Sequence, residues 1–184
     1  MSHPDSTLRE AMRCLVIGNS GSGKSTLAAR LAHAHRLQHL DLDVLAWEPR
    51  VVPPKRRAVD DSARDIAAFV DAHRASDGWA IEGCYADLAE VAATRCTSLV
   101  FLNPGVDACV ANARARPWEP HKYATREEQD AGLEFLIGWI GDYATRRDVF
   151  GLSAHRAVFE GFAGPKEELV TREAIASFEW PRLP

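Results

Sequence analysis

The chain has 184 residues, of which 46% are hydrophobic and 26% charged, values that suit one globular α/β domain with a full hydrophobic core. Its formal net charge of -4 argues against a broad nucleic-acid-binding surface. Residues 1–10 lack the apolar core of a signal peptide, no apolar run approaches the length of a membrane span, and the four scattered cysteines form no C-x-x-C pair. We therefore expect a cytoplasmic protein with reduced cysteines that binds neither nucleic acid nor a membrane.

The first predicted element is a buried strand that runs into a glycine-rich loop and a helix. The apolar run 14–17 predicts the strand, and good helix formers fill 27–32. The pattern G-x-x-x-x-G-K-[ST] lies between them and is formed by Gly18, Gly23, Lys24 and Ser25. This pattern is that of the phosphate-binding P-loop; a glycine-rich surface loop that carries a lysine by chance is the alternative.

A P-loop holds phosphate oxygens with its inward-pointing backbone N–H groups and with the positive end of the following helix. The lysine, here Lys24, reaches the β- and γ-phosphates, and the hydroxyl of Ser25 ligates Mg²⁺. We expect ATP to contact Gly18, Ser20, Gly21, Ser22, Gly23, Lys24, Ser25 and Thr26.

Strand and helix patterns alternate through the next part of the chain. A short second strand ends near Asp41, and three prolines make 48–55 a loop. The segment 58–75 is an amphipathic helix with apolar residues among charges, and 79–82 is a third strand closed by Gly83.

A strongly apolar fourth strand is predicted at 98–102, where Asn103-Pro104-Gly105 ends it. Helices are predicted before it at 88–93 and after it at 106–115, and 117–124 is irregular.

The last third of the chain begins with a possible capping box formed by Thr125 and Glu128. A long helix follows, with apolar positions from 133 to 143, and reaches the basic pair Arg146-Arg147. A fifth strand is predicted at 157–159, then a loop at 161–164 and a last helix at 166–178.

Strands that alternate with helices predict a parallel sheet covered on both faces. Ligands of such sheets bind beyond the carboxyl ends of the strands. The polar residues and glycines at or just past these predicted ends are Gly18, Asp41, Asp43, Glu82, Asn103 and Gly161.

Carboxylates are needed near a P-loop to hold Mg²⁺ or to orient an attacking hydroxyl. Asp43 and Glu82 are the best candidates because each follows a strand predicted beside the P-loop strand, and Asp41 is the third. We assign Asp43 to the acceptor as general base, and Glu82 to the metal together with Ser25. Helix capping by the aspartates and a simple strand-end charge at Glu82 are the alternatives.

Arginines are expected to clamp the transferring phosphoryl group, since the reaction needs no covalent intermediate. The candidates flank the predicted helices near the cleft and are Arg114, Arg116, Arg126, Arg146 and Arg147. We place Arg114 and Arg146 in the catalytic set; for any single arginine, a solvated surface position is the alternative. Trp47, Tyr85 and Trp118 are candidates for stacking on a base or a sugar.

The chain resembles the P-loop small-molecule and nucleoside monophosphate kinases, and most of all the adenylate-kinase-related proteins labelled DNA topology modulation proteins. Three stretches carry the resemblance: 17–26 with the P-loop, Leu42-Asp43-Val44-Leu45-Ala46-Trp47, and 79–85 with Glu82-Gly83. Family members often show Asn where this chain has Cys84, and Asp-x-Pro where it has Asn103-Pro104.

The resemblance implies a three-layer α/β/α P-loop NTPase fold with a five-stranded parallel sheet in the adenylate-kinase order, ATP with Mg²⁺, and an arginine-bearing helical lid. We expect a single domain over 1–184 with the lid inserted at about 114–148. Related kinases wrap backbone around the adenine after the last strand. We therefore expect the segment 161–166, with Gly164 and Lys166, to lie against the base.

The expected function is ATP-dependent phosphoryl transfer to a small-molecule or nucleotide acceptor. A nucleotide-dependent regulatory or binding ATPase without such an acceptor is the alternative. The sequence identifies neither the acceptor nor the oligomeric state.

Overall fold

The computed structural model describes residues 11–49, 51, 54–73, 78–119 and 124–180; the segment 1–10, where no signal peptide is expected, lies outside them. The described residues form a five-stranded parallel sheet in the order β2-β3-β1-β4-β5. Its strands are β1 (Met12–Gly18), β2 (Gln38–Asp41), β3 (Gly78–Gly83), β4 (Ser98–Leu102) and β5 (Lys166–Leu169). The predicted α/β fold with a five-stranded parallel sheet is confirmed.

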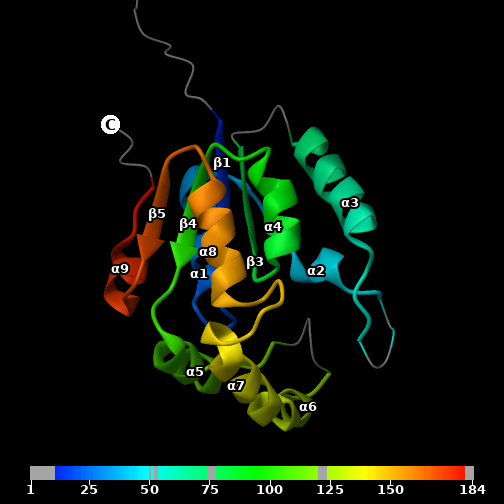
Figure 1. Cartoon of the computed structure of the whole chain (residues 1–184), viewed down its shortest axis with the longest axis vertical. Coiled ribbons are helices and arrows are strands. Elements are labelled where there is room, and N and C mark those ends of the chain that lie inside the picture. Colours follow the sequence, from blue (N-terminus) through cyan, green and yellow to red (C-terminus); the bar gives the residue numbers. More distant parts are fainter. Residues whose placement is uncertain (1–10, 50, 52–53, 74–77, 120–123, 181–184) are drawn as a thin grey trace, which may run out of the picture.

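Helices cover both faces of the sheet because the side chains of the central strand alternate between two cores. Leu15 and Ile17 face one core, and Cys14 and Val16 face the other; all four are fully buried. The first core lies under α3 (Val59–Ala72), α4 (Ala86–Ala93) and α8 (Leu152–Gly161), and the second under α1 (Lys24–His35) and α9 (Arg172–Ser177) (Figure 1). No helix of the described segments is both long and apolar enough to cross a membrane.

A third group of helices lies beyond the carboxyl ends of the strands, at the end of the molecule that carries the P-loop (Figure 1). It comprises α5 (Val106–Arg114), α6 (Arg126–Ala131), α7 (Leu133–Gly141) and the 3₁₀ turn η1 (Asp142–Ala144). A small core of Cys109, Ala113 and Ile140 joins α5 to α7. The short helix α2 (Asp43–Ala46) follows β2 at the same end.

The prediction for the last strand is wrong, and the prediction for the last helix is correct only in its later part, where α9 lies. Residues 157–159 belong to α8, and β5 occupies the start of the predicted helix. Val158 and Phe159 have high β propensity, but they continue the helical spacing of His155 and Phe162, and this face packs on the first core. The sequence Lys-Glu-Glu-Leu of β5 favours a helix, but β5 is an edge strand whose first two side chains are exposed.

This correction moves the segment predicted to contact the adenine. Lys166 pairs in register with Leu99 at the amino end of β4, whereas Gly18 of the P-loop pairs with Leu102 at its carboxyl end. The Lys166 ammonium donates to the carbonyls of Glu160 and Phe162, at 2.9 and 2.7 Å, and so caps the end of α8. Gly164 and Lys166 therefore lie near the amino ends of the strands, whereas the P-loop lies at the carboxyl ends. Gly161 ends α8 instead of following a strand.

The other predicted elements are present, with one helix divided. Thr125 caps α6 as predicted, since its hydroxyl accepts the N–H of Glu128 at 3.1 Å. The Glu128 carboxylate turns back to the N–H of Ala124, one residue earlier than a standard capping box requires. The long helix predicted from this cap is broken at Gly132 into α6 and α7. Of the irregular segment 117–124, residues 120–123 lie outside the described part.

Candidate nucleotide-binding site

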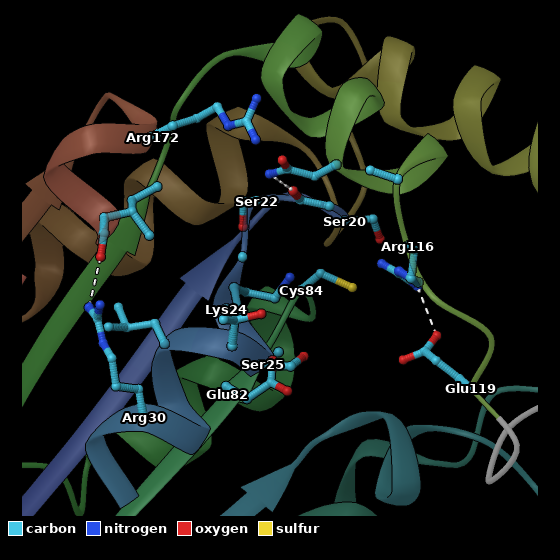
Figure 2. A pocket seen from close by; sticks show the side chains of 18 of the residues that line it. Ser20, Ser22, Lys24, Ser25, Arg30, Glu82, Cys84, Arg116, Glu119 and Arg172 are labelled. Carbon is cyan, nitrogen blue, oxygen red and sulfur yellow. Dashed lines mark hydrogen bonds and ion pairs between the residues drawn. The ribbon is translucent and has the colours of Figure 1, made fainter. Parts of the chain in front are cut away.

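A pocket of about 570 Å³ opens beyond the carboxyl ends of β1 and β3 (Figure 2). The P-loop forms its floor, α9 lies on one side, and the end of α5 lies on the other. Its lining residues outside 20–27 are Arg30, Asp43, Glu82, Gly83, Cys84, Asn112, Ala115, Arg116, Pro117, Glu119, Arg172, Ile175 and Ala176.

Two glycines of the P-loop are required by close backbone approach as well as by conformation. Gly18 has a φ of 151°, and a Cβ there would lie 2.3 Å from the carbonyl oxygen of Leu102. Gly21 has a φ of 75°, and a Cβ there would lie 2.3 Å from the carbonyl oxygen of Cys109. Any larger residue would push the loop away from β4 or α5 and would change the direction of its N–H groups.

The P-loop lysine is buried and already held by the loop. Lys24 is 8% exposed, and its ammonium donates to the carbonyl of Asn19 at 2.9 Å. Two side-chain amides join the loop to the helices above it: Asn19 Nδ2 donates to the carbonyl of Ile140 on α7 at 3.2 Å, and Asn112 Nδ2 on α5 donates to the carbonyl of Gly21 at 2.8 Å. The loop is therefore shaped before any ligand binds.

Glu82 lies on β3 beside the P-loop strand and is 1% exposed. Burial raises the pKa of its carboxyl group to about 7, while the charge of Lys24 and a hydrogen bond with the Ser25 side chain oppose the rise. Its Oε1 atom and the Ser22 hydroxyl are buried without a hydrogen-bond partner in the described residues. Unsatisfied oxygens beside a lysine and a serine fit a site for Mg²⁺ and phosphate.

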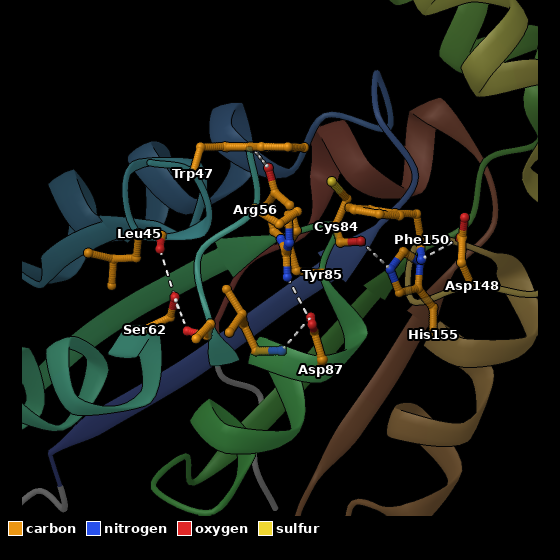
Figure 3. Close-up of polar contacts among 12 residues, drawn as sticks. Leu45, Trp47, Arg56, Ser62, Cys84, Tyr85, Asp87, Asp148, Phe150 and His155 are labelled. Carbon is orange, nitrogen blue, oxygen red and sulfur yellow. Dashed lines mark hydrogen bonds and ion pairs between the residues drawn. The ribbon is translucent and has the colours of Figure 1, made fainter. Parts of the chain in front are cut away.

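Asp43 begins α2 and lines the same pocket, but the strand before it, β2, pairs with β3 and not, as predicted, with the P-loop strand β1. The Oδ1 atom of Asp43 accepts the hydroxyl proton of Tyr85 at 2.5 Å. The same hydroxyl accepts the indole N–H of Trp47 at 2.8 Å (Figure 3). Asp43 does not cap α2, which has no side-chain cap; instead the neighbouring Asp41 carboxylate accepts the Asp43 N–H at 2.8 Å. The Asp41 carboxylate therefore stabilises the turn before α2, and neither aspartate caps this helix.

The two arginines assigned to the catalytic set do not line the pocket. Arg114 is half exposed and pairs with Glu134 at 3.4 Å, on the outer side of α5. Arg146 pairs with Asp148 at 2.6 Å, and its guanidinium lies 3.5 Å from the ring centroid of Trp139. The candidate that does line the pocket is Arg116, which points into it beside Glu119, its partner at 3.3 Å (Figure 2).

Sequence reasoning missed several pocket residues near α9 and the P-loop. Arg30 on α1 donates to the carbonyls of Ile175 and Phe178, both at 2.8 Å, and fixes α9 against the P-loop helix. Arg172 follows β5, so a correct position for that strand would have pointed to it. Asn19 and Asn112 gave no signal, because a lone asparagine has no pattern that marks it as a loop anchor.

A buried histidine supports the backbone next to Glu82. His155 is fully buried, and its ring bonds the hydroxyl of Tyr143 at 2.8 Å. Its other ring nitrogen bonds the carbonyl of Cys84 at 3.0 Å (Figure 3). Burial lowers the pKa of His155 to about 4, so the ring is neutral near pH 7 and donates to Cys84 through Nε2. His155 thereby fixes the turn that presents the Cys84 side chain to the pocket.

The family model described as "AAA domain" matches residues 14–127, which include the P-loop, Asp43 and Glu82. The chain belongs to the AAA-domain family. The match ends in the first turn of α6, so the later helices of this AAA-domain protein and β5 lie outside it. No curated protein is similar enough in sequence to count as a relative.

Solved structures similar to this AAA-domain protein are distant. A sugar kinase from Janibacter sp. HTCC2649, unliganded, is 16% identical with a TM-score of 0.49, over 88% of this chain and 86% of that chain. A gluconokinase from Sinorhizobium meliloti 1021 is 16% identical with a TM-score of 0.48, over 90% of both chains. An uncharacterized protein from Eubacterium ventriosum ATCC 27560 is 13% identical with a TM-score of 0.47, over 91% and 95%. Similarity at this level carries no argument about the activity of this chain.

Proposed function

We propose that the protein transfers the γ-phosphoryl group of ATP to a hydroxyl group of a small molecule. The observation that carries this proposal is that the P-loop lysine and Asp43 line one pocket, where Asp43 is held by side chains instead of capping a helix. A protein that only binds a nucleotide needs the P-loop but no oriented carboxylate beside it. The narrower kinship with the DNA topology modulation proteins is part of the proposal.

The two ends of the pocket suit the two substrates. β5 and β2 are the opposite edges of the sheet, so α9 and Asp43 flank the P-loop on opposite sides. The base of ATP would lie toward Arg172 and Ile175, and its phosphates over the P-loop. Bound Mg²⁺ would neutralise phosphate charge, with Ser25 and Glu82 as its protein ligands. Within the described residues no three His, Cys, Asp or Glu side chains gather for a metal, so phosphate oxygens would complete the set.

Asp43 would act on the acceptor in the transfer step. The acceptor oxygen forms a bond to the γ-phosphorus as the bond from that phosphorus to the bridging oxygen of ADP breaks, and the hydroxyl proton passes to the Asp43 carboxylate late in the step. Lys24 would stabilise charge on the phosphates from the P-loop side, and Arg116 from the side of α5. Arg116 replaces Arg114 and Arg146 in the proposed clamp. The lid would be the segment at about 114–148, within a single domain.

Asp43→Asn should reduce phosphoryl transfer about a hundredfold or more while the affinity for ATP changes little. The reason is that the proposed base lies on the acceptor side of the pocket, away from the P-loop. The measurement is ADP release from MgATP across a panel of sugars, polyols and nucleosides, beside nucleotide titration of both proteins. An equal loss of ATP binding would assign Asp43 to the metal or to the fold, and release stimulated by no small molecule but by a protein partner would favour the regulatory ATPase.

Arg116→Ala should lower turnover about tenfold to a hundredfold, whereas Arg114→Ala should leave it within about twofold. The two arginines are near neighbours at the end of α5, and each pairs with a glutamate, but of the two Arg116 alone lines the pocket. Steady-state ADP release with the best acceptor compares them directly. A larger effect at Arg114 would show that the clamp is formed by the outer side of α5.

A further inference from the structure

We propose that Tyr85 is a positioning residue for phosphoryl transfer: its hydroxyl bond to Oδ1 fixes the Asp43 carboxylate that takes the acceptor's proton. This inference rests on the proposed function. Tyr85 touches no reacting group itself; it would act through Asp43, which lines the pocket.

The chemistry of the three side chains gives the hydrogen-bond chain one direction. An indole N–H can only donate, so the Trp47 bond at 2.8 Å uses an acceptor lone pair of the Tyr85 hydroxyl. The single proton of that hydroxyl is then directed to Oδ1 of Asp43 at 2.5 Å, which must accept it. The chain runs from Trp47 through Tyr85 to Asp43, and it favours the ionised carboxylate.

The Tyr85 ring cannot turn away from this bond, because three separate segments enclose it. It is 3% exposed, and its centroid lies 6.4 Å from that of Trp47 and 5.3 Å from that of Phe150, both in edge-on contact (Figure 3). The Arg56 guanidinium lies 4.6 Å from the ring centroid and is itself held by Asp87 at 2.8 Å. The hydroxyl therefore keeps one position at the tip of a fixed ring.

The charged groups around Asp43 explain why the hydrogen bond from Tyr85 matters for the transfer step. The charges that act on Glu82 are those of Lys24, Asp41 and Asp43. Asp43 and Glu82 also act on the Cys84 thiol. The Arg56 guanidinium lies over the Tyr85 ring. Neighbouring carboxylates repel one another and favour other side-chain positions. A donated hydrogen bond from a fixed phenol holds Asp43 at the pocket wall against that repulsion. The transfer step needs this because a reacting group displaced by about an ångström loses much of its rate.

A double-mutant cycle tests whether Tyr85 acts through Asp43. Tyr85→Phe keeps the ring and removes the hydroxyl, so we expect kcat for ADP release to fall about tenfold while the KM for ATP stays within about twofold. In the Asp43→Asn background the same change should lower kcat by less than about twofold, because the group that Tyr85 orients is already disabled. The probe is MgATP with the best acceptor of the panel, or with water as the acceptor.

Tyr143→Phe is the matched control. Tyr143 is as buried as Tyr85, each 3% exposed, and its hydroxyl bonds His155 at 2.8 Å. Within the described residues its hydroxyl makes no hydrogen bond to Trp47, Tyr85 or Asp43. The factor by which Tyr143→Phe lowers kcat should be the same in the Asp43→Asn background as in the parent protein. Equal factors for Tyr85→Phe in both backgrounds would overturn the positioning role and leave the proposed function intact. A fully active Asp43→Asn protein would instead overturn the role of Asp43 in the proposed function.

Discussion

Lys24→Ala is expected to abolish ATP turnover, with a loss of about a hundredfold or more, while the fold stays intact. Lys24 is buried at the floor of the pocket, where its ammonium would neutralise phosphate charge at little exposure to water. Among the described residues it donates to the Asn19 carbonyl, a single hydrogen bond whose loss should leave the fold intact. Circular dichroism with thermal melting checks the fold, and ADP release checks turnover.

Lys166→Ala is the control for this experiment. Lys166 is also a lysine and makes two hydrogen bonds, but it caps α8 near the amino ends of the strands, away from the P-loop. It should keep full turnover and lose a little stability. Unchanged ATP turnover in a folded Lys24→Ala protein would exclude the P-loop as the nucleotide site.

Glu82→Gln is expected to stabilise the ligand-free protein and to impair turnover at the same time. In the unfolded chain the carboxyl ionises near its ordinary value of 4.5, whereas burial raises its pKa in the folded protein to about 7. Below pH 4.5 both states hold the proton and there is no penalty. Between pH 4.5 and 7 only the unfolded state ionises, so folding stability falls by up to about 3 kcal/mol and stays low above pH 7.

Glutamine cannot ionise, so the variant should avoid that loss. Its advantage in the free energy of unfolding should be absent near pH 4.5 and grow to between about 1 and 3 kcal/mol at pH 8, measured by urea unfolding at several pH values. Glu90→Gln, an exposed position on α4, should show no such pH-dependent gain. A Glu82→Gln protein that is less stable at pH 8 than at pH 4.5, relative to the parent, would contradict the buried-charge explanation.

The same variant should need more Mg²⁺ for turnover, since the proposed metal would lose a charged ligand. The Glu82→Gln substitution would then raise the free energy of unfolding and lower the rate of turnover. That result would distinguish a carboxylate kept for function from a strand-end charge kept for solvation.

The elements that a local pattern determines were predictable from the sequence. The P-loop and the strands with continuous apolar runs, such as 14–17 and 98–102, fall where they were expected. Asp43 and Glu82 were found because each follows a strand that the sequence already marked, and the structure brings both to the P-loop pocket.

The errors lie where long-range packing overrides local preference. The sequence of β5 is charged, and only its pairing with β4 makes it a strand. Val158 and Phe159 favour a strand locally, yet their place in α8 buries them against the first core. The wrong position of the segment predicted to contact the adenine and the failure to identify Arg172 both followed from that one error. The choice between Arg114 and Arg116 depended on which side of α5 faces the pocket, a question that the end of a short helix does not answer from sequence.

The bonds from Asn112 to Gly21 and from Asn19 to Ile140 anchor the segment above the pocket at both of its roots. A segment bonded to the P-loop near both of its ends cannot move away from the pocket as one rigid body. Between the two bonds lie the end of α5 with Arg116, then α6 and most of α7. Because each bond has one partner in the P-loop, a nucleotide bound there would contact a loop that is already joined to α5 and to α7.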